Sequence, residues 1–351
     1  MTRCLAVLGI LIFAAVLGGQ SASGQTLPGG ASIPGVGGKT PSLPGGAKLP
    51  GGSNPMDCGG DLGTSAAAVK VKAFLDAGAE VDKASASLEA TVHDACRDMA
   101  KALQISTDGT TKVLCNRVAT ELRTSFKVGV KSQTAVKTTY KPAQCKVNAD
   151  FAADVAAKCD GHARADVRVS CSGTCSGRCE GKCSGKCEQK NAKGLCNGQC
   201  DGTCSGDCSG SCSGAADVDG SAECKASASA RANMKAECTE PKVDVAIDSK
   251  MVVDASRVGR AEKALHAGLP ALLAANAKAK LVARSAKLWA STAAKLAGSG
   301  SAVVKGLGAK AVCVAGDLAA AAKVATQVNV RVSVSVEASA SVSGAAGAKS
   351  N

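Results

Sequence analysis

Cysteine is the residue type in this 351-residue chain whose number and spacing could do chemistry. The chain has 19 cysteines, and ten of them recur at four-residue steps in two runs, residues 171–187 and 196–212. Thiolates in such a pattern can bind a soft metal ion, exchange disulfides in a redox reaction, or be joined permanently as structural disulfides. The cellular compartment and the geometry of the repeat decide among these three uses.

The N-terminus indicates the compartment. One arginine is followed by an apolar stretch from about Leu5 to Leu17 and then by small residues, which is the pattern of a secretory signal peptide over residues 1–24. An uncleaved membrane anchor is the alternative. Removal of Cys4 with the signal leaves 18 of the 19 cysteines, an even number that permits complete pairing. We expect a secreted bacterial protein, extracellular or on the cell surface with the periplasm as an alternative, in an oxidising environment where disulfides persist.

The repeat predicts how the cysteines pair. Glycine fills most units between the cysteines and disfavours a helix, whereas in an extended strand a four-residue step places every cysteine on one face. Neighbouring cysteines are then roughly 13 Å apart, beyond the Cα distance of about 4.4 to 6.8 Å that a disulfide allows, so the partners must lie on another strand. Residues that face each other in an antiparallel hairpin have a constant sum of numbers, and seven cysteine pairs share the sum 383. The predicted disulfides are Cys145–Cys238, Cys159–Cys224, Cys171–Cys212, Cys175–Cys208, Cys179–Cys204, Cys183–Cys200 and Cys187–Cys196.

The same symmetry extends below the cysteines. Pro142 and Pro241 also sum to 383, and because proline cannot donate to a β ladder they indicate a corner where the hairpin leaves its base. Below this corner, we expect Val136 to face Ile247 and Val130 to face Val253. The prediction is one very long antiparallel β-hairpin over residues 126–256. Its basal parts are 126–141 and 242–256, its disulfide-laddered stalk is 145–238, and its tip is 188–195.

Helices are expected on both sides of the hairpin. A Pro- and Gly-rich flexible linker at 25–57 precedes a helical hairpin at 58–125, in which apolar residues recur at three- and four-residue steps. A second helical hairpin is expected at 257–326, kinked or split at Pro270. Together they would form an Ala-rich four-helix bundle. Residues 327–343 alternate small apolar and polar residues, which predicts a third strand for a small antiparallel basal sheet and hence an α+β fold.

Four cysteines of the mature chain lie outside the hairpin. Cys96 and Cys115 straddle a turn between two expected helices, and an antiparallel helix pair would bring them level, so we expect a disulfide between them. That leaves Cys58 and Cys313 to join the first and last helices of the bundle. The four residues allow three connectivities, and this one is the hypothesis.

Metal and redox chemistry fit the pattern less well. Zinc sites use C-x2-C clusters, whereas three residues separate the cysteines of the repeat, and no C-x-x-C redox motif occurs. A cysteine-rich metal-binding protein stays as a third hypothesis. The histidines His93, His162 and His266 lack a convincing acid partner in the sequence, and no nucleotide-binding or zinc-protease motif is present. We therefore expect neither an enzyme nor a cofactor.

The composition favours a structural function. Aromatic residues are only 2% of the chain, so its core must be built from small side chains and cystine. The leading hypothesis is a secreted or cell-surface structural or adhesive protein that presents a rigid disulfide-braced spike and forms homo-oligomers through its Cys/Gly/Ala face. Lys190, Asn191 and Lys193 are the candidate contacts at the tip. The alternative is a pore-forming or translocation component whose amphipathic hairpin oligomerises into a barrel.

The net charge of +13 indicates which partners to expect. A basic surface would meet an anionic envelope polymer or a membrane surface. Nucleic acid is not expected, because no aromatic residues interleave with the basic ones to stack on bases. We expect no small-molecule substrate, and no segment after the signal that crosses a membrane as a helix.

Overall fold

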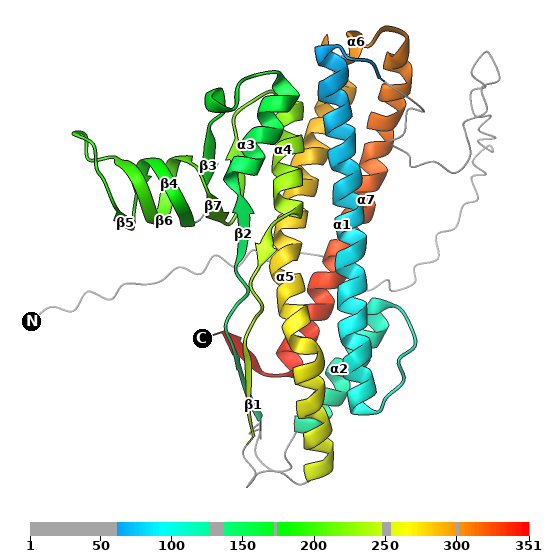
Figure 1. Cartoon of the computed structure of the whole chain (residues 1–351). Coiled ribbons are helices and arrows are strands. Elements are labelled where there is room, and N and C mark those ends of the chain that lie inside the picture. Colours follow the sequence, from blue (N-terminus) through cyan, green and yellow to red (C-terminus); the bar gives the residue numbers. More distant parts are fainter. Residues whose placement is uncertain (1–61, 127–135, 172–173, 248–253, 299–301, 351) are drawn as a thin grey trace, which may run out of the picture. The chain divides into compact units, whose positions relative to one another are not determined.

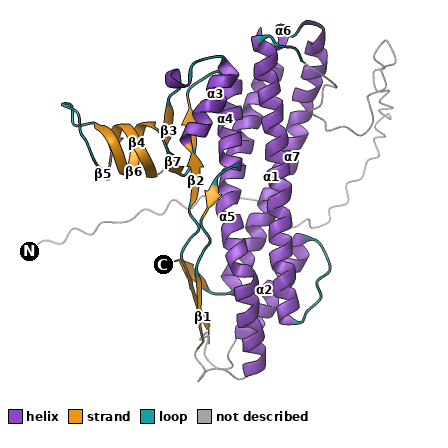
Figure 2. Cartoon of the chain, viewed as in Figure 1, coloured by secondary structure: helices purple, strands orange, loops and turns teal. Residues whose placement is uncertain are grey.

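A computed structural model describes residues 62–126, 136–171, 174–247, 254–298 and 302–350 of the chain (Figure 1). The predicted signal peptide, the linker, Cys58, and the expected pair Val130 and Val253 lie outside these residues. The described part is a mixed fold of long helices, a small sheet and a larger curled sheet (Figure 2). Disulfides link the strands of the curled sheet to one another.

The first predicted helical hairpin is present. Helix α1 (Ala66–Leu103) begins at Ser65, whose side chain accepts a hydrogen bond from the backbone N–H of Ala68. Helix α2 (Thr111–Phe126) packs against α1, and both bury one apolar face. The Cys96–Cys115 disulfide closes this hairpin across a Cα distance of 5.2 Å.

The second helical segment differs from the expectation. Helix α5 (Ala255–Gly298) continues through Pro270, so the proline does not split it. After the short helix α6 (Ala302–Lys305) and a 3-10 turn at Gly308–Lys310, helix α7 (Ala311–Ala345) packs against α1, α2 and α5.

The predicted C-terminal strand at 327–343 is wrong, because this segment lies within α7. Valine at every second position also places apolar residues four apart, and burial of Val328, Val332, Ser335 and Val342 follows the helical period. The buried Ser335 hydroxyl donates to the carbonyl of Arg331, which satisfies it within the helix. Packing against neighbouring helices therefore outweighs the β propensity of valine. By length and composition α7 could cross a membrane, with a mean hydropathy of 1.3 over 18 residues, contrary to the sequence expectation.

Helices α1, α2, α5 and α7 pack together as the main part of a helical body. The core of this helical body is built from small residues around one aromatic pair. Phe74 and Trp289 stack with ring centroids 5.4 Å apart, and the Trp289 indole N–H donates to the Phe74 carbonyl at 3.0 Å. Gly78 of α1 lies directly under the indole, where a methyl group would overlap the ring. The close approach of α1 and α5 therefore depends on a glycine at this position.

The base of the predicted hairpin is confirmed in register and corrected in composition. Strand β1 (Val136–Tyr140) pairs antiparallel with β10 (Val243–Ile247), and Val136 faces Ile247 as predicted. The third strand of this sheet is β11 (Ala348–Ser350), which runs parallel to β1. The expected third strand and the all-antiparallel arrangement are both wrong, because α7 carries the chain past the sheet before β11 begins.

The legs of the predicted stalk are interrupted by helices. Helix α3 (Ala149–Asp160) begins at Asn148, whose side chain accepts from the backbone N–H of Phe151, and ends at Gly161 in the left-handed region. Helix α4 (Ala222–Met234) occupies the matching place on the other leg and packs against α1, α3 and α5. A single continuous hairpin and a simple four-helix bundle are therefore both incorrect, since α4 is a further member of the helical body.

The remaining strands form one curled sheet in the order β8-β3-β6-β4-β7-β2-β9, with β5 beside β6. Figure 1 shows β4 and β6 wound around each other rather than lying flat. A 3-10 turn at Arg164–Asp166 precedes β3. The strands are β2 (Cys145–Asn148), β3 (Val169–Cys171), β4 (Thr174–Cys183), β5 (Lys186–Cys187), β6 (Cys196–Cys208), β7 (Ser211–Ser213), β8 (Ala216–Val218) and β9 (Glu237–Cys238).

Candidate functional site

The two cysteine runs form a coiled two-stranded ribbon, which comprises Cys171 and residues 174–213 and which we call the cystine coil. Along β4, residue numbers rise while those of the partners on β6 fall, as in a hairpin. Cys179 pairs with Cys208 in one ladder and with Gly198 in another, and Gly181 pairs in the same way with Gly206 and Cys196. Because the two partners of each residue are ten residues apart on β6, one turn of the ribbon takes about ten residues of that leg.

This winding covers the edges of the ribbon. β4 is paired with β6 in two registers and also with β7, so its backbone groups are bonded on both sides over much of its length. A flat two-stranded hairpin would leave one unpaired edge on each strand, and such edges recruit other chains. Coiling therefore lets an isolated hairpin satisfy its own backbone without a partner sheet.

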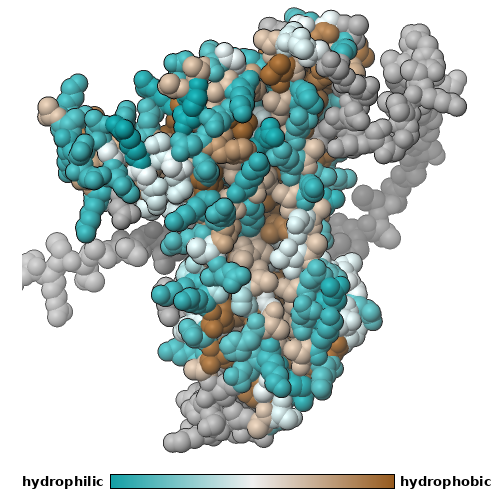
Figure 3. Space-filling model, in the orientation of Figure 1, coloured by the Kyte–Doolittle hydropathy of each residue, from teal (hydrophilic) through white to brown (hydrophobic). Residues whose placement is uncertain are grey.

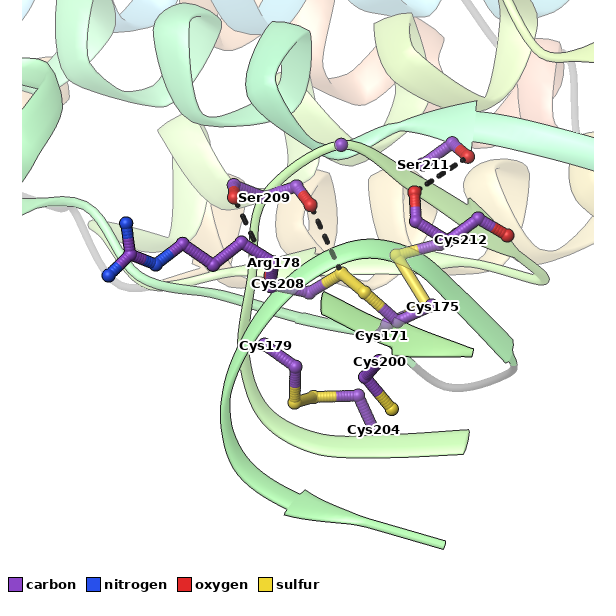
Figure 4. The surroundings of a disulfide bond; sticks show 12 residues. Cys171, Cys175, Arg178, Cys179, Cys200, Cys204, Cys208, Ser209, Ser211 and Cys212 are labelled. Atoms are coloured by element: carbon purple, nitrogen blue, oxygen red, sulfur yellow. Dashed lines mark hydrogen bonds between the residues drawn. A yellow bond between two sulfur atoms is a disulfide. The ribbon is translucent and has the colours of Figure 1, made fainter. Parts of the chain in front are cut away.

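The interior of the cystine coil is filled with sulfur. In the Cys-x-Gly-x repeat, cysteine and glycine share one face of the strand, and this face turns inward. Cys175, Cys179, Cys200 and Cys212 are fully buried. Figure 4 shows the disulfides gathered on the inner side of the curving strands, while Arg178 extends away from them.

Glycine is required where the turns of the coil approach most closely. A methyl group on Gly177 would overlap the backbone carbonyl oxygen of Ser209. Gly206 has a φ of +149°, and a methyl group there would meet the carbonyl oxygen of Glu180. The repeat therefore alternates a side chain that bridges the interior with one that leaves room for the neighbouring strand.

The structure joins all seven cysteine pairs that share the sum 383. Within the coil, the Cα atoms of bonded cysteines are 5.5 to 6.6 Å apart, which is the ordinary range for disulfides. Cys145–Cys238 and Cys159–Cys224 are the two outer bridges. The disulfide partners are therefore the ones that the constant sum of 383 predicts, both inside the repeat and in the non-repetitive sequence outside it.

The strand register of the coil nevertheless differs from the predicted one. Cys175 faces Cys212 in the ladder but is bonded to Cys208, which lies four residues nearer to the tip on the same leg. At the base of the ribbon, by contrast, Cys145 faces the cysteine to which it is bonded, Cys238. A flat hairpin would make register and disulfide partner identical, whereas curvature brings diagonal neighbours together inside the coil.

Helices α3 and α4 fasten the coil to the helical body. The Cys159–Cys224 disulfide joins the two helices. The Asp150 carboxylate accepts from the backbone N–H of Gly210 at 3.0 Å and pairs with Arg164 at 2.6 Å. Polar contacts thus tie the coil to α3, and the disulfide ties α3 to α4.

A second carboxylate ties α3 to the helical body. The Asp160 carboxylate accepts from the Ser221 backbone N–H and pairs with Lys70 of α1 at 2.7 Å. Burial opposes the charge of Asp160, but these hydrogen bonds and the ammonium outweigh burial and lower its pKa below 3.8. Asp160 is therefore held ionised where α3, α4 and α1 meet.

The predicted tip residues are exposed, but they do not have equal roles. The Asn191 side-chain oxygen accepts from the backbone N–H groups of Lys193 and Leu195, at 2.9 and 3.0 Å. Asn191 therefore shapes the turn, with Gly194 in the left-handed region beside it. Glu188, Lys190 and Lys193 are the charged side chains that the tip presents to solvent, so the tip carries a net positive charge.

Three clustered cysteines and the three histidines are the side chains suited to metal binding or acid–base catalysis. The sulfur atoms of Cys171, Cys208 and Cys212 lie within 4.8 Å of one another, but each belongs to a disulfide, so no thiolate is available there for a metal. His93 lies 3.4 Å from the Gly109 carbonyl oxygen and 3.8 Å from the Asp94 carboxylate. The other two histidines are both exposed: His162 lies in the loop after α3, and His266 lies on α5.

The cysteine chemistry indicates where the protein works. Eight disulfides join sixteen described cysteines, and Cys313 is also disulfide-bonded. So many bridges point to an oxidising extracellular environment for this cysteine-rich protein. Comparison with models of protein families, with curated proteins and with solved structures finds no match to this chain.

Proposed function

We propose that this chain is an extracellular structural protein, without enzymatic activity, whose cystine coil is a rigid adhesive element. One observation carries the proposal: the inward positions of the coil are cysteine or glycine, so the longer side chains of the repeat point outward. Nested disulfides limit the freedom of such an element both when folded and when unfolded. The coil thus combines a covalently fixed scaffold with a polar outer surface, which Figure 3 shows as largely hydrophilic.

The outer surface of the first leg carries a row of basic residues, with the acidic residues Glu180 and Glu188 among them; Arg178 of this row lies 3.8 Å from the Glu180 carboxylate. Basic residues recur at four-residue steps along the first leg and continue into the tip, and all of them are exposed. They are Arg178, Lys182, Lys186, Lys190 and Lys193. This row supports an anionic polymer as the contacted partner, because regularly spaced cations match a regularly charged chain. A membrane surface is the other anionic partner that the row would fit.

The alternatives fit the coil less well. Self-association through the Cys/Gly/Ala face would require a face that is turned inward and buried. Opening of the hairpin into a transmembrane barrel would require unwinding of a cross-linked coil and loss of α3 and α4. A metal store would require reduction of the disulfides. We therefore favour contact through the row and the tip over these three functions.

Binding of the mature protein to surface-immobilised polyglutamate, measured by biolayer interferometry, tests the proposal. We expect salt-sensitive binding that is weakened several-fold in the double variant Lys190→Glu/Lys193→Glu. The matched control is Lys263→Glu/Lys323→Glu, which makes the same change in net charge at exposed positions of α5 and α7. Equal losses in both variants would mean that net charge rather than the coil drives binding, and would refute the proposed contact.

A further inference from the structure

A groove with a volume of about 690 Å³ lies between α1, α5 and the C-terminal end of α4. Its surface is mostly apolar and includes Leu88, Met234 and several alanines of α5. Figure 3 shows apolar surface between the hydrophilic side chains along the helices. Binding sites for small molecules usually have this size and this apolar character, with a few polar groups that orient the ligand.

The charged groups at this groove are mainly basic. Lys83, Lys235 and Lys278 line it, and no ion pair of these three lysines occurs within the described ranges. Glu80 is the acidic residue of the lining, and its carboxylate is paired with Arg231 at 3.1 Å. The groove therefore offers uncompensated positive charge beside an apolar floor.

The three lysines differ in what they can offer to a ligand. Lys278 donates to the carbonyls of Asn233, Met234 and Ala236, at 3.3, 2.7 and 3.1 Å, so it is committed to the end of α4. Burial lowers its pKa. Lys83 and Lys235 are exposed, and the Lys235 ammonium lies 4.3 Å from the centre of the Phe151 ring. Lys83 and Lys235 are thus the cations available to an incoming anion.

We propose that this groove binds a single-chain anionic amphiphile, a medium-chain fatty acid, with its carboxylate at Lys83 and Lys235. The hydrocarbon chain would cover the apolar floor formed by α1, α5 and Met234, while the carboxylate would replace water at the lysines. A neutral amphiphile would leave these cations without an acceptor. The choice of ligand therefore rests on charge complementarity and on the apolar surface, and it is independent of the function proposed for the coil.

Calorimetric titration of the mature, oxidised protein with octanoate, decanoate, laurate and dodecanol tests this proposal. We expect affinity to rise by up to about fourfold for each methylene that is buried. The variant Lys83→Glu/Lys235→Glu should lose affinity for laurate but keep its affinity for dodecanol, and Lys263→Glu/Lys323→Glu should change neither. A larger side chain in Ala274→Trp should weaken binding of both ligands by filling the groove.

The outcomes separate a groove from a charged surface. Affinity for laurate that is unchanged in both the lysine and the Ala274→Trp variants would overturn the proposal, as would affinity that is independent of chain length. Binding to anionic phosphatidylglycerol vesicles without binding of free laurate would also overturn it, because the site would then recognise a bilayer. The lysines replaced in Lys83→Glu/Lys235→Glu are exposed, and the substitutions leave the apolar floor intact. The result for this variant therefore does not depend on whether Ala274→Trp folds.

Discussion

Seven disulfides have residue numbers that sum to 383, and each encloses the next one along the hairpin. Removal of the outermost one gives a quantitative test of this nested arrangement. The Cys145–Cys238 disulfide closes a loop with a sequence separation of 93, but the next bridge inward, Cys159–Cys224, already closes 65 of these residues. In the unfolded chain the outer bridge therefore restricts only 28 additional residues. The loop-entropy relation gives about 3.6 kcal/mol for 28 residues, against about 4.7 kcal/mol for an isolated loop of 93.

The perturbation is the double variant Cys145→Ser/Cys238→Ser, which leaves no unpaired thiol to exchange with other bridges. Both cysteines are only partly buried, so the serine hydroxyls can reach water and add little cost of their own. We expect urea denaturation without reductant, followed by circular dichroism, to show a loss of about 3.6 kcal/mol in the free energy of unfolding. Peptide mapping of the variant controls for unchanged pairing of the other cysteines. A loss below about 1 kcal/mol, or one matching the isolated loop, would refute the nested arrangement.

Two further predictions concern the helical body. The pKa of Asp160 is lowered by Lys70, so the ionised form stabilises the fold above pH 3.8, and this stabilisation is lost as the pH falls through the lower folded-state pKa. We expect Asp160→Asn to lower the free energy of unfolding by about 1 to 3 kcal/mol at pH 7. The difference should disappear in urea denaturation at a pH well below 3.8; a constant difference would contradict the assigned ion pair. Gly78→Ala should destabilise by about 1 to 3 kcal/mol through overlap with Trp289. Gly259→Ala, on α5 in open space, should stabilise by about 0.5 to 1 kcal/mol, and thermal unfolding in which both variants shift the same way would contradict this packing.

The partners of the cysteines in the hairpin could be predicted because each bonded pair lies at equal distances in sequence from one midpoint. The reflection about one midpoint holds for bridges in the repeat, for the outer bridges, and for the facing pair Val136 and Ile247. The turn between α1 and α2 likewise places Cys96 level with Cys115. These relations do not require knowledge of how the ribbon bends.

The curvature of the ribbon could not be predicted in this way. Disulfide spacing is compatible with a flat ladder or a coiled one, and the close packing of the turns is evident only from contacts in the structure such as those at Gly177 and Gly206. Helix α3 was not predicted from the sequence, because its alanines occur at both odd and even positions and so do not distinguish a helix from a strand. The buried residues Ala149, Ala152, Ala153 and Ala156 fit the helical period, yet the same segment also supports an alternating interpretation.

The identical inward positions of the cystine coil have a consequence for how this module can evolve. Inserting one Cys-x-Gly-x unit at mirrored points of both legs would preserve every reflected partner and add one cross-link. Inserting a unit in one leg alone would leave an odd thiol and shift every outer pair. Length variants that persist should therefore arise by coordinated duplication in both legs, and the reach of the coil can change while its chemistry stays the same.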